Sequence, residues 1–352
     1  MTENKKRYDI SMLRVFSMVM IILCHIIKNY PFPYSDKLSE VFNAFVYTFL
    51  GMSGYLFGGK EIKKFREWFA NRIKRIWIPV IVIVVADTLL LTLFSNELVT
   101  KRQFLVYFFN LQGLLFIDWS FFNKIFGGEI INLVPLWFTT VIMICYGIVP
   151  SLQWIRDGIT KMFRYTWLFI LIVLFSIFGV LEYSNGFHGF YFAAFTAGYG
   201  LGDFHNRGKR LGKSTVICMI ALTMILQIGR LIVQRQFDGS AMYSTYIGYS
   251  HTALGLIFLI TFTELGLFKE SLFSFGKSAV IKKMDAYSMY VYMVHQLFCA
   301  RPWNVYERHS IFISTILFII CTCAAAYILR IITERIIGYL DSLQIKRTIT
   351  MR

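Results

Sequence analysis

Residues 7–25, RYDISMLRVFSMVMIILCH, begin with charged side chains and continue as an apolar helix. Two ionisable side chains lie inside this helix, Arg14 and His25. Eleven residues make three helical turns plus about 20°, so both side chains leave one face, roughly 16 Å apart along the axis. Ionisable groups within a membrane helix are costly and usually mark a pathway or a site. The alternative is that neither side chain is functional: Arg14 extends its charged group to the membrane surface, and His25 is an interior residue with its hydrogen bonds satisfied.

The whole chain has the composition of a membrane protein. Of its 352 residues, 57% are hydrophobic and 16% are charged, which excludes an ordinary soluble domain of this length. Apolar runs of membrane-spanning length recur along it, and because they do not alternate with period two they exclude a β-barrel. The sequence therefore predicts an all-α, polytopic integral membrane protein. We expect a single membrane domain over residues 1–352, with no fused soluble domain.

About ten transmembrane helices are expected from the apolar runs. Their predicted ranges are 10–27, 38–57, 76–94, 133–149, 166–181, 190–204, 215–233, 243–267, 286–300 and 311–332. The segment 104–117 is apolar but short, and polar residues interrupt it. We expect it to lie at the interface or to re-enter the membrane without crossing it.

The distribution of positive charge predicts the orientation. With the N-terminus inside, 25 of the 36 Lys and Arg residues fall in inner segments, so both termini are expected in the cytoplasm. The net charge of +16 then reflects orientation and contact with anionic membrane lipid, and no nucleic-acid partner is expected. The six cysteines lie in apolar runs without the spacing of a zinc site or a disulfide framework, so no metal is expected.

Two stretches near the predicted inner face contain candidate binding residues. In FLGMSGYL, residues 49–56, small residues around Ser53 allow a ligand or another helix to approach the backbone. In NRIKRIWIP, residues 71–79, Arg72 and Arg75 are three residues apart and suit the binding of phosphate groups. Plain helix packing and contact with lipid headgroups are the respective alternatives.

Candidate residues on the outer side are aromatic or acidic. Trp137 lies in LVPLWFTT, which begins at Leu133, and Glu182 closes the fifth predicted span. Aromatic rings beside a carboxylate suit a hydroxyl-rich ligand, whereas the ordinary aromatic belt of membrane proteins is the alternative interpretation of the rings.

The ninth predicted span contains MDAYSMYVYMVHQLF, which begins at Met284. Ser288, Tyr292 and His295 would share one face of a continuous helix. Ser288 and His295 would then lie about 10 Å apart, which is too far for a nucleophile and its base.

In their order and spacing, these motifs resemble those of the acyltransferase 3 family, integral membrane enzymes that O-acylate sugars and related hydroxyl compounds. The resemblance covers about residues 7–334. It rests on the Arg-x10-His spacing of the first helix, the Ser-Gly-aromatic-Leu element, the Arg-x-x-Arg-Ile…Pro element, the Leu-Trp-Phe element and the Ser-x-x-x-Tyr-x-x-His helix. Members often place a glutamate shortly after Leu-Trp-Phe, where this chain has Thr139, Thr140 and Val141.

The resemblance implies transfer of an acyl group from a thioester to a hydroxyl. The expected activity is that of a cell-membrane O-acetyltransferase that uses cytoplasmic acetyl-CoA as a co-substrate, without a bound cofactor, to modify a cell-surface or exported glycan. His25 is the expected general base, since imidazole accepts a proton near neutral pH, and Arg14 an anchor for the donor or a stabiliser of charge. The expected donor-binding residues are Ser53, Arg72 and Arg75, and the expected acceptor-binding residues are Trp137, Glu182, Tyr292 and His295.

Two other functions are compatible with the composition. The first is a secondary transporter of sugars or lipid-linked glycans, although the sequence lacks the convincing internal repeats and broken helices typical of that class. The second is transfer of a succinyl group, or acylation of a small hydroxylated metabolite.

Overall fold

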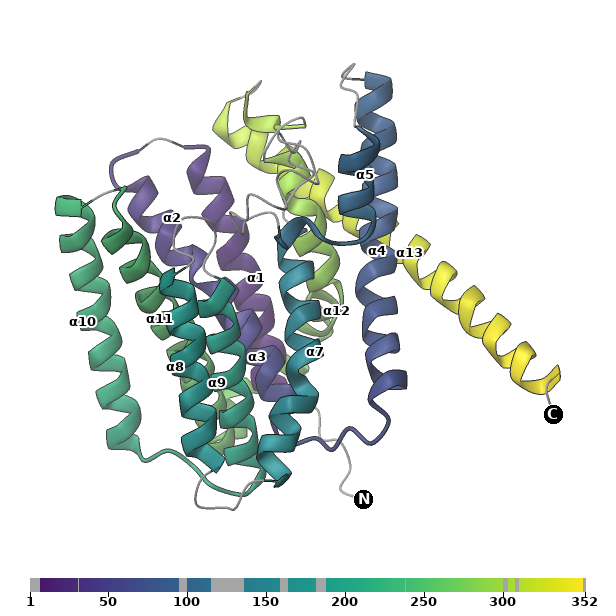
Figure 1. Ribbon diagram of the computed structural model, residues 1–352. Coiled ribbons are helices and arrows are strands. Elements are labelled where there is room, and N and C mark those ends of the chain that lie inside the picture. Colours follow the sequence, from purple (N-terminus) through teal and green to yellow (C-terminus); the bar gives the residue numbers. More distant parts are fainter. Residues whose placement is uncertain are drawn as a thin grey trace. The chain divides into compact units, whose positions relative to one another are not determined.

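The computed structural model describes residues 7–30, 32–94, 100–114, 136–158, 164–181, 188–237, 239–299, 303–307 and 310–350. Every regular element in these ranges is helical (Figure 1), which confirms the predicted all-α class. Seven helical segments among the described residues, one of which is Ser35–Gly58, are long and apolar enough to cross a membrane, which is compatible with a polytopic membrane protein. The expected number of ten spans is not confirmed.

The described helices follow one another along the chain in this order. They are α1 (Tyr8–Lys28), α2 (Ser35–Asn43), α3 (Phe45–Gly58), α4 (Phe65–Phe94), α5 (Lys101–Phe108), η1 (Gln112–Leu114), α7 (Trp137–Gly158), α8 (Arg164–Leu181), α9 (His188–Asn206), α10 (Lys213–Phe237), α11 (Ala241–Phe268), η2 (Glu270–Lys277), α12 (Ala279–Val294), η3 (His295–Phe298), η4 (Val305–Glu307) and α13 (Ile311–Thr350).

Two predicted spans are not the continuous helices that the sequence suggests. The second is divided into α2 and α3 at Ala44, whose N–H bonds the carbonyl of Val41, three residues back. The ninth leaves the α-helical conformation after Val294, because the Nδ1–H of His295 donates to the Tyr292 carbonyl at 2.6 Å and a 3-10 turn follows. Ser288 and Tyr292 therefore lie within the α-helix, and His295 is the first residue after it.

The other predicted ranges agree with the helices in position but not always in length. α4 begins at Phe65, so the basic segment with Arg72 and Arg75 is already helical, and α13 continues to Thr350. The short segment at 104–117 overlaps the end of α5 and contains η1, and the eight residues of α5 are too few to cross a membrane. Residues 115–117, 133–135 and 300 of the predicted segments lie outside the described residues.

The chain divides into two compact units. The first unit comprises Met1–Lys63 and Cys145–Ser288, and the second comprises Lys64–Ile144 and Met289–Arg352. In the first unit, α1, α3, α9 and α11 pack around a core to which Ile10, Leu13 and Leu259 contribute. In the second unit, α4 packs against α5 and α13.

Glycine residues bring the backbones of α3 and α9 into direct contact in the first unit. A Cβ at Gly54 would lie 2.0 Å from the carbonyl oxygen of Phe195. A Cβ at Gly198 would lie 2.0 Å from the carbonyl oxygen of Gly51. The small residues expected at 49–56 therefore serve close helix packing, as is common in membrane helices.

This packing predicts opposite effects for two neighbouring glycines of α9. Gly198→Ala should destabilise the protein by about 1–3 kcal/mol, because the new methyl group meets the backbone of α3, which cannot rotate away. Gly200→Ala is the matched control, since its Cβ would first meet Leu168 Cδ1, at 3.5 Å. That change should be neutral or stabilising, because alanine is the better helix former. Thermal unfolding in detergent measures both, and equal midpoints would contradict the close-packing account.

Candidate functional site

Arg14 and His25 both lie on α1, as the sequence predicts. α1 belongs to the first unit, where Ile10 and Leu13 share a core cluster with Met52 on α3. The apolar face of α1 therefore holds this helix in place, and its polar face carries the two ionisable side chains. This gives the two ionisable side chains a defined separation of roughly 16 Å along the axis.

Asp285, near the start of α12, is the partner of Arg14. The Nη1 of Arg14 donates to Asp285 Oδ1 at 2.6 Å, and the Ser11 hydroxyl donates to Oδ2 at 2.9 Å. Among the residues that the structure describes, no partner is found for the other N–H groups of Arg14, whose side chain is 30% exposed. The arginine is thus held from one side and still has donors for an anionic ligand.

His25 lies in the last turn of α1 and is half-buried. The side-chain amide of Asn29 donates to the His25 carbonyl at 2.9 Å and closes the helix end. The backbone around His25 is therefore ordered by a local hydrogen bond. The imidazole itself is half-buried, so part of it is exposed to a ligand, as a general base requires.

A chain of hydrogen bonds joins the ends of four helices at the other end of α1. The Arg7 guanidinium donates to Tyr55 at 2.9 Å, Tyr55 donates to His205 Nδ1 at 3.0 Å, and His205 Nε2 bonds Glu264 at 2.7 Å. Burial alone would lower the pKa of Arg7, but the hydrogen bond and charge of Asp9 outweigh it, and the pKa is raised. Arg7 is therefore a permanent cation at this end of the unit.

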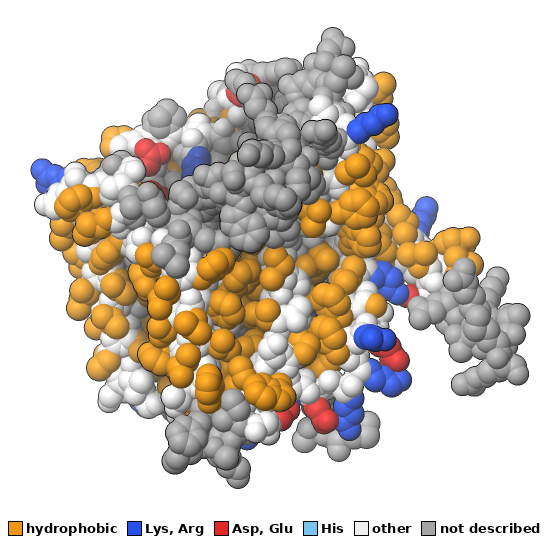
Figure 2. Space-filling model, in the orientation of Figure 1, with side chains coloured by type: hydrophobic (Ala, Val, Ile, Leu, Met, Phe, Trp, Pro, Cys, Tyr) orange, Lys and Arg blue, Asp and Glu red, His pale blue; other side chains and the backbone are white. Residues whose placement is uncertain are grey.

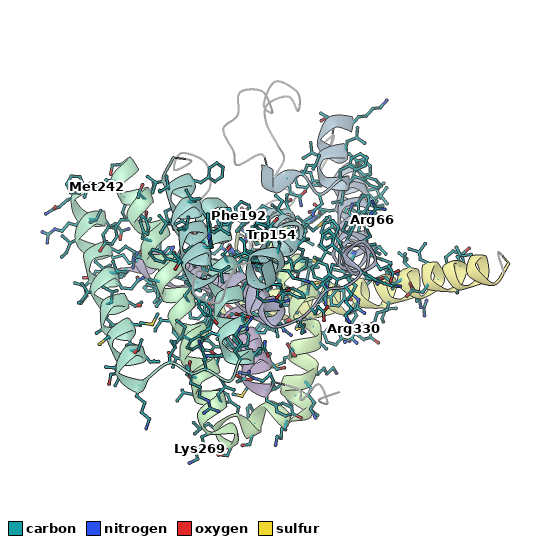
Figure 3. All side chains as sticks on the ribbon, turned by 60° about the horizontal axis from the view of Figure 1, so that its bottom comes forward. Arg66, Trp154, Phe192, Met242, Lys269 and Arg330 are labelled. Carbon is teal, nitrogen blue, oxygen red and sulfur yellow. The ribbon has the colours of Figure 1, made fainter. Side chains whose placement is uncertain are left out.

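The members of this chain of hydrogen bonds are not predicted by any of the sequence motifs. Tyr55, His205 and Glu264 lie in the last turns of α3, α9 and α11, where they resemble ordinary interfacial residues. A pattern in the sequence could have identified them. Each is a polar side chain within two turns of the end of an apolar helix, and the three helices are predicted to end on the same side of the membrane. In Figure 3, Met242 and Lys269 mark the two ends of α11, and Glu264 belongs to the turns before Lys269.

The predicted donor-binding residues are distributed over both units. Ser53 lies on α3 in the first unit, half-buried and two residues before Tyr55. Arg72 and Arg75 lie on α4 in the second unit. The guanidinium of Arg72 lies over the Trp68 ring, 5.9 Å from its centroid, and Arg75 is exposed.

Three of the four predicted acceptor-binding residues are connected in the second unit. Trp137 contacts Phe138 with ring centroids 6.1 Å apart, Phe138 contacts Tyr292 at 5.0 Å, and Tyr292 contacts His295 at 5.5 Å. Trp137 is half-buried, whereas Tyr292 and His295 are buried. The fourth, Glu182, lies outside the described residues.

Threonines occupy the position where the family often has a glutamate, and they have a structural role here. The Thr140 hydroxyl donates to the Asn110 carbonyl at 2.8 Å and accepts from the N–H of Gly113 at 3.0 Å. Thr139 donates to the Asn110 side chain. These bonds connect the segment after α5 to the first turn of α7.

The polar residues that interrupt α10 and α11 form a second cluster, remote from Arg14. Arg230 pairs with Glu40 of α2, and the Tyr243 hydroxyl donates to the same carboxylate at 2.8 Å. Gln227 donates to the Ser250 carbonyl at 2.8 Å. These side chains therefore connect three helices through hydrogen bonds.

The fold and the site define a multi-pass α-helical membrane protein with an ion-paired arginine and a half-buried histidine on its first helix. A family model described as "Acyltransferase domain" matches residues 7–335, and the chain belongs to this family of membrane acyltransferases. Comparison with curated proteins and with solved structures gives no match. Among the described residues, no group of three or more metal-ligating side chains is found that could hold a metal ion.

Proposed function

We propose that this acyltransferase moves an acetyl group from cytoplasmic acetyl-CoA to a hydroxyl of a cell-surface or exported glycan. The observation that carries the proposal is the arrangement of α1, which presents a partly satisfied arginine and a half-buried histidine roughly 16 Å apart. That offset suits a long donor, with its phosphates near Arg14 and its thioester near His25. Membership of the acyltransferase family supports the reaction class.

His25 is proposed as the general base. Its neutral imidazole takes the proton of the acceptor hydroxyl while the hydroxyl oxygen attacks the carbonyl carbon of the thioester. The carbon–sulfur bond then breaks, and its electron pair leaves with the coenzyme A sulfur. The proton held by His25 passes to this thiolate, so the imidazole is neutral again after each transfer.

Arg14 is proposed as the anchor of the donor. Asp285, which also accepts a hydrogen bond from the Ser11 hydroxyl, accepts one from Nη1 of the guanidinium, and the remaining N–H groups form a planar array that suits phosphate. Ser53 in the first unit, and Arg72 and Arg75 in the second, are each proposed to bind the donor. Trp137, Glu182, Tyr292 and His295 are proposed to bind the acceptor.

The orientation predicted from Lys and Arg would bring the donor from the cytoplasm and place His25 in the outer half of the membrane. The reaction would then connect a cytoplasmic donor to an acceptor that is reached from outside. This part of the proposal depends on the charge distribution and on the position of His25 at the far end of α1 from Arg7.

Vesicles of defined orientation test the proposal. Acetyl-CoA is supplied on the cytoplasmic face of inside-out and right-side-out vesicles, and free coenzyme A and acetylated glycan are both measured. We expect both products when the glycan is on the outer face. Modification of glycan only on the cytoplasmic face would contradict the transmembrane arrangement. Turnover with succinyl-CoA alone would contradict the acetyl group, and glycan movement without coenzyme A release would indicate a transporter.

A further inference from the structure

An apolar groove lies in the first unit, away from Arg14 and His25. It has a volume of about 410 Å³ and is lined by residues of α8, α9, α10 and α11. This volume is within the range of about 300–1,000 Å³ that is usual for small-ligand sites. The lining residues belong to neither the proposed donor site nor the proposed acceptor site, so the reaction leaves the groove unexplained.

The polar groups of the groove wall are already satisfied. Two lining residues carry hydroxyls: Tyr165 donates to Asp203 at 3.2 Å, and Thr223 donates to the Met219 carbonyl at 2.8 Å. The other lining side chains are aliphatic, aromatic or thioether groups, apart from one glycine. A polar occupant would lose its hydrogen bonds to water without replacement, so the wall selects a hydrocarbon occupant.

The groove is open at an apolar outer face of the unit, and its length matches part of a lipid acyl chain. On α10 its wall runs from Met219 to Leu226, and on α9 from Ala197 to Phe204, about 10 Å in each case. One leaflet contains roughly 15 Å of hydrocarbon. The wall residue Leu222 is 58% exposed, and hydrophobic side chains cover the middle of the face formed by α8, α9 and α10 (Figure 2).

Positive charge lies at one end of the groove. The Lys209 ammonium is 5.7 Å from the ring centroid of Tyr165 and 5.9 Å from that of Phe204, and both rings line the groove. Arg210 follows it and is exposed. Arg207 is neutralised by Asp203, but within the described part of the chain no carboxylate forms an ion pair with Lys209 or Arg210.

We propose that this groove is a binding site for one acyl chain of an anionic phospholipid, whose headgroup binds Lys209 and Arg210. The apolar wall supplies the site for the chain, and the two cations supply charge complementarity for the headgroup. The lateral opening lets the lipid enter from the membrane without crossing water. The site would keep α8 and α10 packed on α9 and α11 at this edge of the unit.

The test measures lipid bound to the purified, folded protein, so its result is independent of acyl transfer. Delipidated protein in detergent is titrated with dioleoyl phosphatidylglycerol and, separately, with dioleoyl phosphatidylcholine, and the first bound lipid is quantified by native mass spectrometry. We expect wild-type protein to bind phosphatidylglycerol more tightly than phosphatidylcholine. Equal affinities would overturn the assignment of the headgroup.

Two variants separate the parts of the site. Gly200→Leu places a side chain in the groove, and it should weaken binding of phosphatidylglycerol about tenfold. Its matched control is Gly147→Leu on α7, where a new Cβ meets nothing within 4 Å. The double variant Lys209→Gln/Arg210→Gln should remove the preference for phosphatidylglycerol, whereas Lys282→Gln/Lys283→Gln, at exposed positions of α12, should retain it.

The following results would overturn the proposal. Unchanged lipid affinity in Gly200→Leu would place the lipid elsewhere, and a change of oligomeric state in that variant would identify a second copy of the chain as the occupant. Should Gly200→Leu fail to fold, the double variant still decides, because its substitutions are at exposed positions in the connection between α9 and α10. Retention of the phosphatidylglycerol preference in that variant would overturn the proposal.

Discussion

Replacing His25 with alanine should lower the rate of acyl transfer by about 10²–10⁴-fold, the usual loss for removing a general base. The folded protein should remain in the membrane, because the imidazole lies half-buried in the last turn of α1, whereas the core contacts of this helix are made by residues such as Ile10 and Leu13. The measurement is release of coenzyme A from acetyl-CoA by the purified variant in the presence of acceptor. Turnover near that of wild type would assign the base to another residue.

Two further variants on α1 separate the role of base from that of anchor. Lys28→Ala is the matched control, since Lys28 is exposed in the same last turn, and its activity should be close to that of wild type. Arg14→Lys replaces a planar fork by a point charge, so it should raise KM for acetyl-CoA more than it lowers kcat. An unchanged KM in Arg14→Lys would contradict the donor-anchor role and leave the role of His25 untouched.

Replacing Arg230 with methionine should destabilise the first unit by about 3–5 kcal/mol, as expected when one partner of a buried ion pair is removed. The Arg230 side chain is 2% exposed and pairs with Glu40, whose side chain is 25% exposed. Without the guanidinium, the Tyr243 hydroxyl still donates to the carboxylate, but the negative charge is no longer compensated. Because Glu40 is partly hydrated, the lower end of the range is expected.

The double variant Arg230→Met/Glu40→Leu is the control for this prediction. It removes both charges and fills the space with apolar groups, so most of the lost stability should return. Unfolding midpoints in detergent for the two single variants and the double variant form a double-mutant cycle. Additive losses would show that the pair contributes no coupling, and would contradict the role assigned to it in connecting α10 to α2.

The class of protein and the positions of its helices could be predicted because both depend on local sequence. Long apolar runs require helices in lipid, where each backbone N–H and C=O must find a partner within its own segment. The helix ends were predicted less well, since polar residues such as Arg72 can continue a helix outside the apolar run. The break at Ala44 and the change of helix type at His295 depend on individual hydrogen bonds that hydropathy does not record.

The sequence predicts which residues belong to the candidate site, but it does not predict which residues they contact. The spacing of Arg14 and His25 on one face follows from helical geometry alone. The partner of Arg14, however, is Asp285, 271 residues further along the chain, and MDAYSMY contains no local sign of that contact. The threonines after Trp137 illustrate the same point, because their bonds to Asn110 define their role only once the two segments are adjacent.

The sequence by itself determined an all-α membrane protein, the motifs of an acyltransferase, and the arginine and histidine of its first helix. The fold class and the spacing on the first helix follow from composition and periodicity, and the acyltransferase motifs from their resemblance to those of a known family. All of them are contained in short stretches of chain. Only the tertiary structure decided which charges are paired and which remain available: Arg230 meets Glu40 across 190 residues, whereas Lys209 and Arg210 have no ion-pair partner in the described part of the chain. The physical reason is that ion pairs and grooves between helices are formed by packing, and packing brings together residues that no local pattern connects.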